Sequence, residues 1–478
     1  MKINSAPLRR SSRLVFDKSK RVSEASDTIV AISTLTGFAG IGIVRLSGSS
    51  ALRITSRIFH PISKKNVKKL PSRSVSLGKI FDGKKIIDEV LLTIMKAPKS
   101  YTREDVVEIS CHGGMVPIRK TLELCIKHGA RPADPGEFTK RAYLNGRIDL
   151  TQAEAVCDII KAKTETALSC AMSQLNGGLS LGINEQKSEL ADILAALEVS
   201  IDYSEDDITV NDKEITKRIE KIRTRLTEIL KTFDSGKIFR EGVRTAIIGK
   251  PNVGKSSLLN VLVGQNKAIV TEIPGTTRDT IEGTIDISGM PLVLTDTAGI
   301  RKHSTDVVEK MGIERSRNTL DSADLVLMVL DSSSELTAED FHIAELVAPK
   351  KVIIVLNKSD LKNRIGHLND LKISAPAVQV SALRNEGIEK LKKSIHGLFV
   401  SGSVRTGDLI LTNVRHKILI EGALDSLGNA VRSLRKGLSE EFTATDLRGA
   451  LNCLGEITGE VPTEEILDRI FSNFCVGK

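Results

Sequence analysis

One stretch constrains this chain more than any other: residues 249–256, GKPNVGKS, fit the phosphate-loop pattern G-x-x-x-x-G-K-[ST] without a gap. Gly249 and Gly254 allow the backbone to curl so that its N–H groups converge on a β-phosphate. Lys255 can then reach the β- and γ-phosphate oxygens, and Ser256 can offer its hydroxyl to Mg²⁺. The loop therefore predicts a nucleoside triphosphate site.

The residues around the loop fit the same prediction. Residues 245–248 are apolar and are predicted to form a buried strand, and residues 257–262 are predicted to form a helix. Taken alone, the loop has a second interpretation, which is a simple glycine turn between a strand and a helix. The loops that follow decide between the two.

Four further loops follow in order, each after an apolar strand. A threonine in 275–279 can complete the Mg²⁺ shell, and 296–299 (DTAG) suits a Mg²⁺-linked Asp and a γ-phosphate-sensing Gly. In 357–360 (NKSD), the Asp360 carboxylate can accept hydrogen bonds from N1–H and N2–H₂ of guanine, which adenine cannot supply. A backbone N–H in 381–383 can meet guanine O6. Five elements in this order predict a Ras-like GTP-binding domain, with its ligand at the carboxyl ends of parallel strands.

The predicted GTP contacts lie in these five loops, at Ser257 directly after the first loop, and in residues 271–274 directly before the second. They are Asn252, Val253, Gly254, Lys255, Ser256, Ser257, Thr271, Glu272, Ile273, Pro274, Gly275, Thr276, Thr277, Asp296, Thr297, Ala298, Gly299, Asn357, Lys358, Asp360, Ser381 and Ala382. Of these, Ser256 and Thr277 are the predicted Mg²⁺ ligands.

The residue after the DTAG motif is Ile300, where small GTPases usually place a Gln that orients the attacking water. An isoleucine cannot do this, so the charge stabilisation must come from another Arg or from a cation. Asn252, inside the phosphate loop, is a candidate oxygen ligand for a monovalent cation. Its simpler interpretation is a turn residue.

The length of 478 residues and the changes in pattern predict a multidomain protein. Residues 1–24 are expected to be a disordered basic extension, with a transit peptide as the alternative. Residues 25–150 mix strands and helices as an α+β domain, with strands expected at 27–32, 41–46, 89–95 and 105–109. Residues 151–240 and 401–478 show a helical period on both sides of the strand–helix alternation in 241–400. We therefore expect an α/β nucleotide domain inserted into one α-helical bundle.

The predicted bundle residues recur at steps of three and four. They are Ile215, Ile219, Ile222, Leu226, Ile229 and Phe233, and then Ile420, Leu424, Leu427, Val431 and Leu434.

The net charge of +9 gives weak support for nucleic-acid binding, because residues 1–24 alone carry a surplus of +5. No apolar run approaches the roughly 18 residues of a membrane span. Six cysteines without zinc spacing, and no secretory signal, predict reduced thiols and a cytoplasmic protein. Cys475 follows an amphipathic helix near the C-terminus. It is either an incidental thiol or a functional one with a lowered pKa.

Motifs outside the nucleotide domain resemble one family, the MnmE (TrmE) tRNA-modification GTPases. The resemblance runs from about Asp27 to Lys478, and its motifs are 27–31 (DTIVA), 42–48 (GIVRLSG), 101–108 (YTREDVVE), 131–139 (RPADPGEFT), 145–150 (NGRIDL) and the terminal 474–478 (FCVGK). The chain departs from the family at residues 35–40, where LTGFAG stands in place of PPGRGG.

The resemblance implies an N-terminal folate-binding domain that makes a homodimer, a split helical domain and an inserted G domain. It implies an FAD-dependent partner of the MnmG (GidA) family, in a heterotetramer. The expected activity adds an aminomethyl or carboxymethylaminomethyl group to C5 of the wobble uridine of certain tRNAs. The carbon is expected from methylene-tetrahydrofolate and the amine from glycine or ammonium. The implied folate contacts are Arg45, Glu108, Arg147 and Lys478.

The resemblance also implies that GTP hydrolysis is stimulated by K⁺, which would replace an arginine finger and promote pairing of two G domains. The implied K⁺ ligands are Asn252, Thr271, Ile273 and Thr276. Glu309 aligns with a glutamate that positions water, and Cys475 is the candidate thiol of the modification chemistry. The alternative function is a regulatory GTP switch that binds a ribosomal or protein partner.

Overall fold

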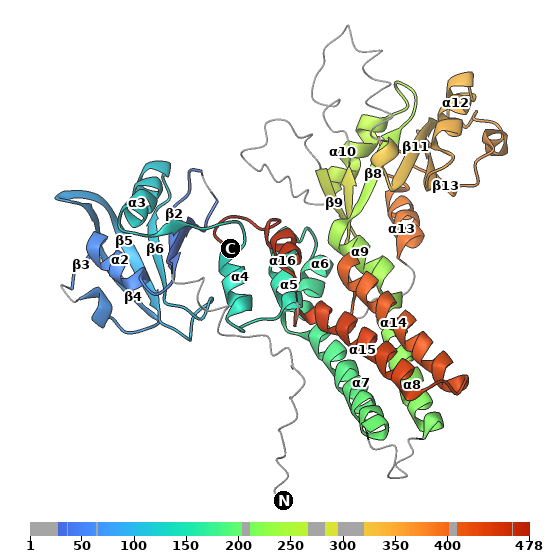
Figure 1. Ribbon diagram of the computed structural model, residues 1–478. Coiled ribbons are helices and arrows are strands. Elements are labelled where there is room, and N and C mark those ends of the chain that lie inside the picture. Colours follow the sequence, from blue (N-terminus) through green and yellow to red (C-terminus); the bar gives the residue numbers. More distant parts are fainter. Residues whose placement is uncertain are drawn as a thin grey trace, which may run out of the picture. The chain divides into compact units, whose positions relative to one another are not determined.

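The structure is a computed structural model that describes residues 27–35, 37–63, 66–202, 211–265, 283–294, 320–400, 409–460 and 462–478 (Figure 1). It divides into two compact units. The first comprises Met1–Asp149 with Thr463–Lys478, and the second comprises Leu150–Pro462. The predicted basic extension, residues 1–24, lies outside the described ranges. In the described part of the chain, no helix has the length and apolar character needed to cross a membrane.

The first unit is built on a mixed sheet whose described strands run in the order β3-β4-β5-β6-β2-β1-β7. The strands are β1 Ile29–Ile32, β2 Ile41–Ser47, β3 Phe59–Pro61, β4 Ser74–Asp82, β5 Lys85–Met95, β6 Val106–His112 and β7 Arg131–Pro132. The strands expected from the alternation near residues 29, 43, 92 and 107 are confirmed as β1, β2, β5 and β6. The sequence analysis did not identify β3, β4 and β7.

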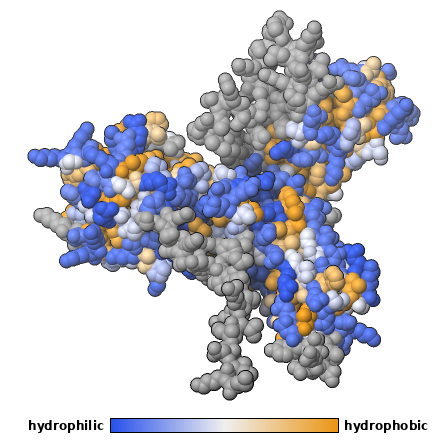
Figure 2. Space-filling view, viewed as in Figure 1, coloured by the Kyte–Doolittle hydropathy of each residue, from blue (hydrophilic) through white to orange (hydrophobic). Residues whose placement is uncertain are grey.

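One face of this sheet carries the core of the first unit. Helices α2 Ala51–Ile58 and α3 Met115–Lys127 pack there, and side chains such as Ile54 and Ile118 meet Leu92 on the strands. The other face leaves Val75 and Leu77 exposed, and Figure 2 shows hydrophobic residues on the visible surface of this unit. The alternation of buried and exposed positions follows from the two-residue period of a strand.

The C-terminal segment belongs to the first unit. Helix α16 Glu464–Phe471 packs on α4 Glu137–Leu144, and a Lys140–Asp468 ion pair (2.9 Å) joins them. Phe471 and Phe474 are buried there, as the amphipathic pattern predicted. The sequence analysis grouped residues 401–478 with the helical domain. The compact units divide that range differently, because α16 packs on α4 of the first unit.

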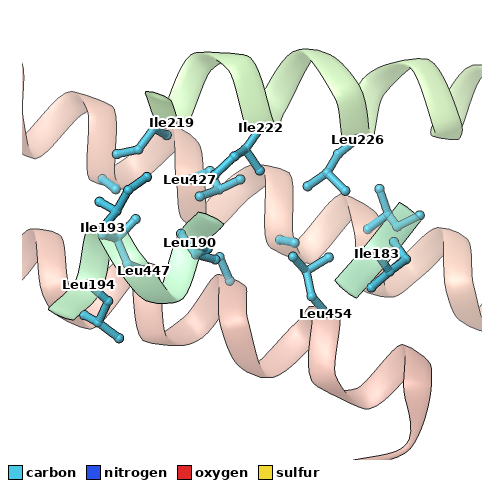
Figure 3. Packing of buried hydrophobic residues seen from close by; sticks show 14 of the residues in the cluster. Ile183, Leu190, Ile193, Leu194, Ile219, Ile222, Leu226, Leu427, Leu447 and Leu454 are labelled. Carbon is cyan, nitrogen blue, oxygen red and sulfur yellow. The ribbon is translucent and has the colours of Figure 1, made fainter. Parts of the chain in front are cut away.

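The helices of the second unit come from both sides of its α/β part. They are α5 Leu150–Lys161, α6 Glu165–Leu175, α7 Gly178–Asp202, α8 Asp212–Lys231, α9 Phe233–Glu241, α14 Val414–Arg435 and α15 Glu440–Thr458. Leu190, Ile222, Leu427 and Leu447, from four different helices, meet in one core (Figure 3). The packing predicted from the helical period is therefore observed.

A buried polar cluster lies beside this core. The carboxylate of Glu154 accepts hydrogen bonds from His416 Nε2 (2.6 Å), from Arg415 (3.0 Å) and from Asn413 (3.0 Å). Burial alone would raise the pKa of Glu154, but its electrostatic attraction to and hydrogen bonds with His416 and Arg415 outweigh burial and lower the pKa to about 2. One turn later, Asp158 pairs with Arg240 on α9 (2.8 Å), the helix that leads into the α/β part.

The α/β part holds a second sheet with the described strands in the order β13-β12-β11-β8-β10-β9. The strands are β8 Val243–Ile248, β9 Gly283–Ile287, β10 Met290–Leu294, β11 Leu325–Asp331, β12 Val352–Asn357 and β13 Ala377–Gln379, and the described helices are α10 Lys255–Gln265, α12 Ala338–Val347 and α13 Ile388–Phe399. All neighbours pair in parallel except β9 with β10. Apolar clusters cover both faces, which confirms a doubly wound domain.

Candidate functional site

The phosphate loop connects β8 to α10, as predicted. Steric crowding explains why both glycines of the phosphate-loop pattern are needed. A Cβ on Gly249 would lie 2.3 Å from the Val329 carbonyl oxygen, and one on Gly254 would lie 2.1 Å from Asn357 Nδ2. Gly254 also has a φ of +95°, which L side chains rarely adopt. The loop can therefore approach the neighbouring strands only with glycine at these two positions.

Lys255 lies inside the curve of the loop. Its ammonium donates to the carbonyl oxygens of Gly249 (2.7 Å) and Lys250 (2.6 Å). Burial lowers its pKa, because partial removal from water disfavours the charged form. Among the described residues, the half-buried ammonium of Lys255 thus donates its hydrogen bonds to neutral carbonyl oxygens, and an anionic phosphate group at this position would complement its charge.

Two other loop residues differ in their surroundings. Asn252 is exposed and has a φ of +63°, a conformation that asparagine tolerates, so its side chain is free to face a ligand. Lys250 was not singled out by the sequence analysis. Its ammonium pairs with Asp340 (2.5 Å) and donates to Thr337 Oγ1 (2.9 Å), which ties the loop to the start of α12. The sequence pattern around Lys250 does not indicate its contacts with Asp340 and Thr337, because these partners lie about 90 residues further along the chain.

The predicted guanine-binding residues meet at the same sheet edge. Asn357 Nδ2 donates to the Val253 carbonyl (2.8 Å), and Asn357 Oδ1 accepts from the Ala382 amide (3.0 Å). Ser381 donates to Asp360 Oδ1 (2.6 Å), and this hydrogen bond lowers the pKa of the Asp360 carboxyl. Asn357 therefore links the phosphate loop directly to the two base-binding loops.

Lys358, the remaining predicted GTP contact of the NKSD loop, pairs with Asp331 at the end of β11 (2.6 Å). Ser256 and Ser257 are exposed at the start of α10. The other predicted nucleotide, Mg²⁺, K⁺ and catalytic residues lie outside the described ranges. They are Thr271, Glu272, Ile273, Pro274, Gly275, Thr276, Thr277, Asp296, Thr297, Ala298, Gly299 and Glu309.

A second cluster lies in the first unit and combines residues far apart in the sequence. Arg45 on β2 faces Glu108 on β6 in register, and its Nε donates to the Glu108 carboxylate (2.8 Å). Arg45 Nη1 and Ser33 Oγ both donate to the Gly477 carbonyl oxygen (3.1 Å each). A Cβ on Gly477 would lie 2.5 Å from the Ile32 carbonyl oxygen, so only glycine fits here. The C-terminal motif is thereby held against the strand that carries Arg45.

Aromatic rings lie beside two of the predicted folate contacts. The Arg45 guanidinium lies 5.7 Å from the centre of the Phe138 ring, and the Arg147 guanidinium lies 4.7 Å from that of Tyr101. Tyr101 packs against the small apolar cluster that contains Phe138. Arg147 is thus connected to Arg45 through two rings, not by direct contact. The sequence analysis quoted the motifs that hold both rings without assigning the rings a role.

The backbone of Cys475 is held at the start of α4 and by the end of the chain itself. The Gly136 amide donates to the Cys475 carbonyl oxygen (3.5 Å), and the Lys478 amide donates to the same oxygen (3.3 Å). The Cys475 thiol is free and exposed. Its backbone is therefore anchored, while its side chain is accessible to solvent.

A network of ion pairs supports α4, which carries Phe138. Arg141 contacts the carboxylates of Asp27 (2.7 Å), Glu104 (3.2 Å) and Glu137 (2.9 Å). Burial opposes the charge of Arg141, but these carboxylates outweigh it and raise the pKa of the guanidinium. The sequence analysis missed this network, although the motif 131–139 contains Glu137 and ends two residues before Arg141.

The described residues fit two of the implied ligands. The loop around Lys255 suits a polyphosphate, and the Arg45–Glu108 pair with its neighbouring rings suits a flat heterocycle that donates hydrogen bonds to a carboxylate. Among the described ranges, no group of three or more His, Cys, Asp or Glu side chains could hold a metal ion. Of the implied K⁺ set, only Asn252 falls within those ranges.

Two family models match the chain. One described as "GTP-binding protein TrmE N-terminus" matches residues 28–147, and one described as "MnmE helical domain" matches residues 150–475. Together they cover both units.

Curated relatives match over almost the full length. "tRNA modification GTPase MnmE" of Alkaliphilus metalliredigens is 48% identical over 458 residues, which is 95% of this chain and 99% of that protein. Proteins of the same name from Clostridioides difficile and Listeria welshimeri are 47% and 46% identical, with the same coverage. Among solved structures, the apo cytosolic domain of the T. maritima FeoB iron transporter is 24% identical over 48% of this chain and 94% of that chain. Its TM-score of 0.25 is too low to support a conclusion. The two family models and the near-complete relatives show that this chain belongs to the MnmE (TrmE) family of tRNA modification GTPases.

Proposed function

We propose that this protein hydrolyses GTP in the cytoplasm and works with an FAD-dependent partner of the MnmG (GidA) family. Together they would add an aminomethyl or carboxymethylaminomethyl group to C5 of the wobble uridine of certain tRNAs. The carbon would come from methylene-tetrahydrofolate and the amine from glycine or ammonium. We propose that the protein is a homodimer and that the complex is a heterotetramer.

The observation that carries this proposal is the cluster of Arg45, Glu108 and Gly477. It joins two strands of the N-terminal sheet to the C-terminal segment, across 432 residues in the case of Arg45 and Gly477. A protein that only switched between GTP and GDP states would have no use for it. The cluster therefore favours an enzyme with a second ligand over a regulatory switch.

The nucleotide-domain residues have separate proposed roles. Lys255 would bind the β- and γ-phosphate oxygens once it leaves the carbonyls of Gly249 and Lys250, and Ser256 would bind Mg²⁺ together with Thr277. The Asp360 carboxylate, kept ionised by Ser381, would accept from guanine N1–H and N2–H₂.

Hydrolysis needs further groups, because Ile300 cannot orient water. We propose that Asn252, with Thr271, Ile273 and Thr276, holds a K⁺ ion that stabilises the charge developing on the phosphates. Glu309 is the proposed residue that positions the attacking water through other waters.

The folate ligand would supply the one-carbon unit when it is bound in the first unit. The Glu108 carboxylate can accept hydrogen bonds from the amino group and ring N–H of a pterin, while Arg45 fixes the orientation of that carboxylate. Phe138 and Tyr101 offer apolar faces near Arg45 and Arg147. Lys478 is the proposed contact from the C-terminal segment.

Cys475 is the proposed thiol of the modification chemistry. Its anchored backbone and exposed side chain are suited to a group that acts on a second molecule. Cys475→Ser should remove tRNA modification and leave GTP hydrolysis at the wild-type rate. If the serine variant still restored the modified nucleoside in cells, Cys475 would be an incidental thiol.

Nucleoside mass spectrometry tests the proposed function directly. We expect tRNA from cells lacking this protein to lose the C5-substituted wobble uridine, and expression of the wild-type chain to restore it. Unchanged wobble uridine in the deleted cells would refute the modification role. GTP hydrolysis by the purified protein, together with no heat on titration of a reduced folate, would favour a regulatory GTP switch.

A further inference from the structure

The positive charge of this chain is concentrated in one short segment of the first unit. Residues 53–99 contain twelve Lys or Arg and three Asp or Glu, a net charge of +9. The whole chain of 478 residues has the same net charge. Outside this segment the charges sum to zero, because the surplus of +5 in residues 1–24 is offset by −5 in the rest of the chain.

The few acidic groups of the segment already have partners. Their contacts are Asp82 with Lys127 (3.2 Å), Asp88 with His112 (2.6 Å) and Glu89 with Lys79 (3.9 Å). Among the described residues, none of these carboxylates pairs with another lysine or arginine of the segment. Those cations thus keep their charge available at the surface.

Seven of these cations form what we call the α2–η1 basic surface. It consists of Arg53, Arg57, Lys68, Lys69, Arg73, Lys96 and Lys99. Six of the side chains are exposed and Lys96 is half-buried, and within the described ranges none of them pairs with a carboxylate. Figure 2 shows a largely hydrophilic edge where α2, β3 and β4 of the first unit lie.

Hydrogen bonds hold the parts of this surface together. Lys96 Nζ donates to the Lys68 carbonyl oxygen in η1 Val67–Lys69 (3.3 Å), and the Lys96 amide donates to Ser72 Oγ (2.9 Å). The Arg73 amide donates to the Ile94 carbonyl oxygen (2.6 Å), and α2 packs against η1. Asp105 is the acidic neighbour, and its carboxylate is engaged by the Ala97 amide (3.0 Å). These contacts join η1, Arg73 and the end of β5, and they place α2, which carries Arg53 and Arg57, next to η1.

We propose that the α2–η1 basic surface binds the phosphate backbone of the tRNA substrate. Unpaired lysines and arginines on one face are the footprint of phosphate contacts, which give affinity without reading sequence. The segment contains no Trp or Tyr, and its exposed His60 already stacks on Phe81 (4.6 Å between ring centres), so backbone contact fits it better than base recognition. This proposal rests on the proposed function, because it takes tRNA as the substrate.

The chain offers a matched control for the test. Lys84 and Lys85 lie at the turn end of the β4–β5 hairpin, where Asp82 pairs in register with Lys85. Arg73 and Lys96 flank the opposite end, where Ser74 pairs with Ile94. Both turn lysines are exposed and neither appears in an ion pair of the described chain. The changes K68Q/K69Q and K84Q/K85Q therefore remove the same charge from two ends of one hairpin.

The experiment measures binding of an unmodified tRNA transcript to the full-length protein by fluorescence anisotropy, over a series of salt concentrations. We expect K68Q/K69Q to weaken binding by roughly tenfold to a hundredfold at 0.1 M salt. The slope of log K against log salt should fall by about two. K84Q/K85Q should bind as the wild type does, and both variants should hydrolyse GTP at the wild-type rate.

Three results would overturn the proposal. Equal weakening by both pairs would show a response to net charge and not to this surface. Unchanged binding by K68Q/K69Q would exclude the surface from RNA contact. Unchanged RNA binding together with lost modification in cells would assign the surface to an acidic protein partner. These three results can be distinguished from a result that refutes the proposed function itself. In that case, the wild-type chain would not restore the modified wobble uridine in cells that lack the protein.

Discussion

The phosphate loop and the Arg45 cluster are assembled in opposite ways. The loop is eight consecutive residues whose backbone and one lysine form the cradle, so its geometry depends mainly on two glycines and a strand–helix connection. The Arg45 cluster joins β2, β6 and the C-terminal segment through side chains. No one of these three segments forms the site without the other two. A site formed mainly by the backbone of one loop can therefore be recognised from a short stretch of sequence. A site formed by side chains from distant segments can be recognised only when the fold is known.

Lys255→Ala is expected to have the largest effect, because it removes the charged group of the local site. GTP hydrolysis should fall by roughly 10² to 10³, the usual loss for one preorganised electrostatic contact. Single-turnover hydrolysis assays measure this, with the exposed Lys390→Ala as the control. Folate binding should stay unchanged, and its loss would show that the two sites are not independent.

The Glu154 cluster, like the Arg45 cluster, is formed by side chains from distant segments, and the pH dependence of protein stability tests its contribution. Because the folded pKa of about 2 lies below the ordinary value of 4.5, the carboxylate stabilises the fold above about pH 4.5. That contribution, about 3 kcal/mol by linkage, is lost as the pH falls towards 2. Denaturant unfolding of the full chain between pH 6 and 2 measures it. Glu154→Gln should flatten this part of the profile, and an identical profile would contradict the assignment.

Arg45→Ala breaks the assembled site in the first unit. We expect affinity for a reduced folate to fall by about tenfold to a hundredfold, since Glu108 loses the charged hydrogen bond that orients it. Isothermal calorimetry measures the change. Lys79→Ala, which removes the looser exposed pair with Glu89 (3.9 Å) on the same sheet, is the control and should bind normally. A normal folate titration by the Arg45 variant would disprove the assignment.

Asn252→Ala should give the smallest effect, a loss of K⁺ stimulation with GTP binding retained. The side chain is exposed and its left-handed backbone is tolerated by few residues, so Asn252→Asp and Asn252→Gly separate the side chain from the turn. Turnover in K⁺ and in Na⁺ is compared for each variant. Equal wild-type rates in the two salts would remove the cation from the mechanism.

The two sites also show what a sequence can predict. The phosphate loop, the NKSD loop and the helical period were predicted from local pattern, because glycine spacing and a three-to-four step act within a few residues. Asn357 bridging Val253 to Ala382, and Lys250 pairing with Asp340, could not be predicted in this way. Such contacts depend on the order of parallel strands, which local spacing does not encode.

In the first unit, too, some features could be predicted from the sequence and others could not. Family motifs marked Arg45 and Glu108, and the structure places them opposite each other on adjacent strands. The placement of α16 beside α4 was not predicted, because the amphipathic pattern of α16 specifies a buried face but not what covers it.

The docking of Gly477 beside Arg45 has a consequence for biosynthesis. During translation, residues 27–149 emerge from the ribosome long before residues 463–478 are made. Domains generally fold in the order of their synthesis. The N-terminal sheet must therefore persist without α16 and Gly477 while the entire second unit is translated. The Arg45 cluster can close only after Gly477 has been made, so products truncated between the phosphate loop and Gly477 would carry the loop without a complete first unit.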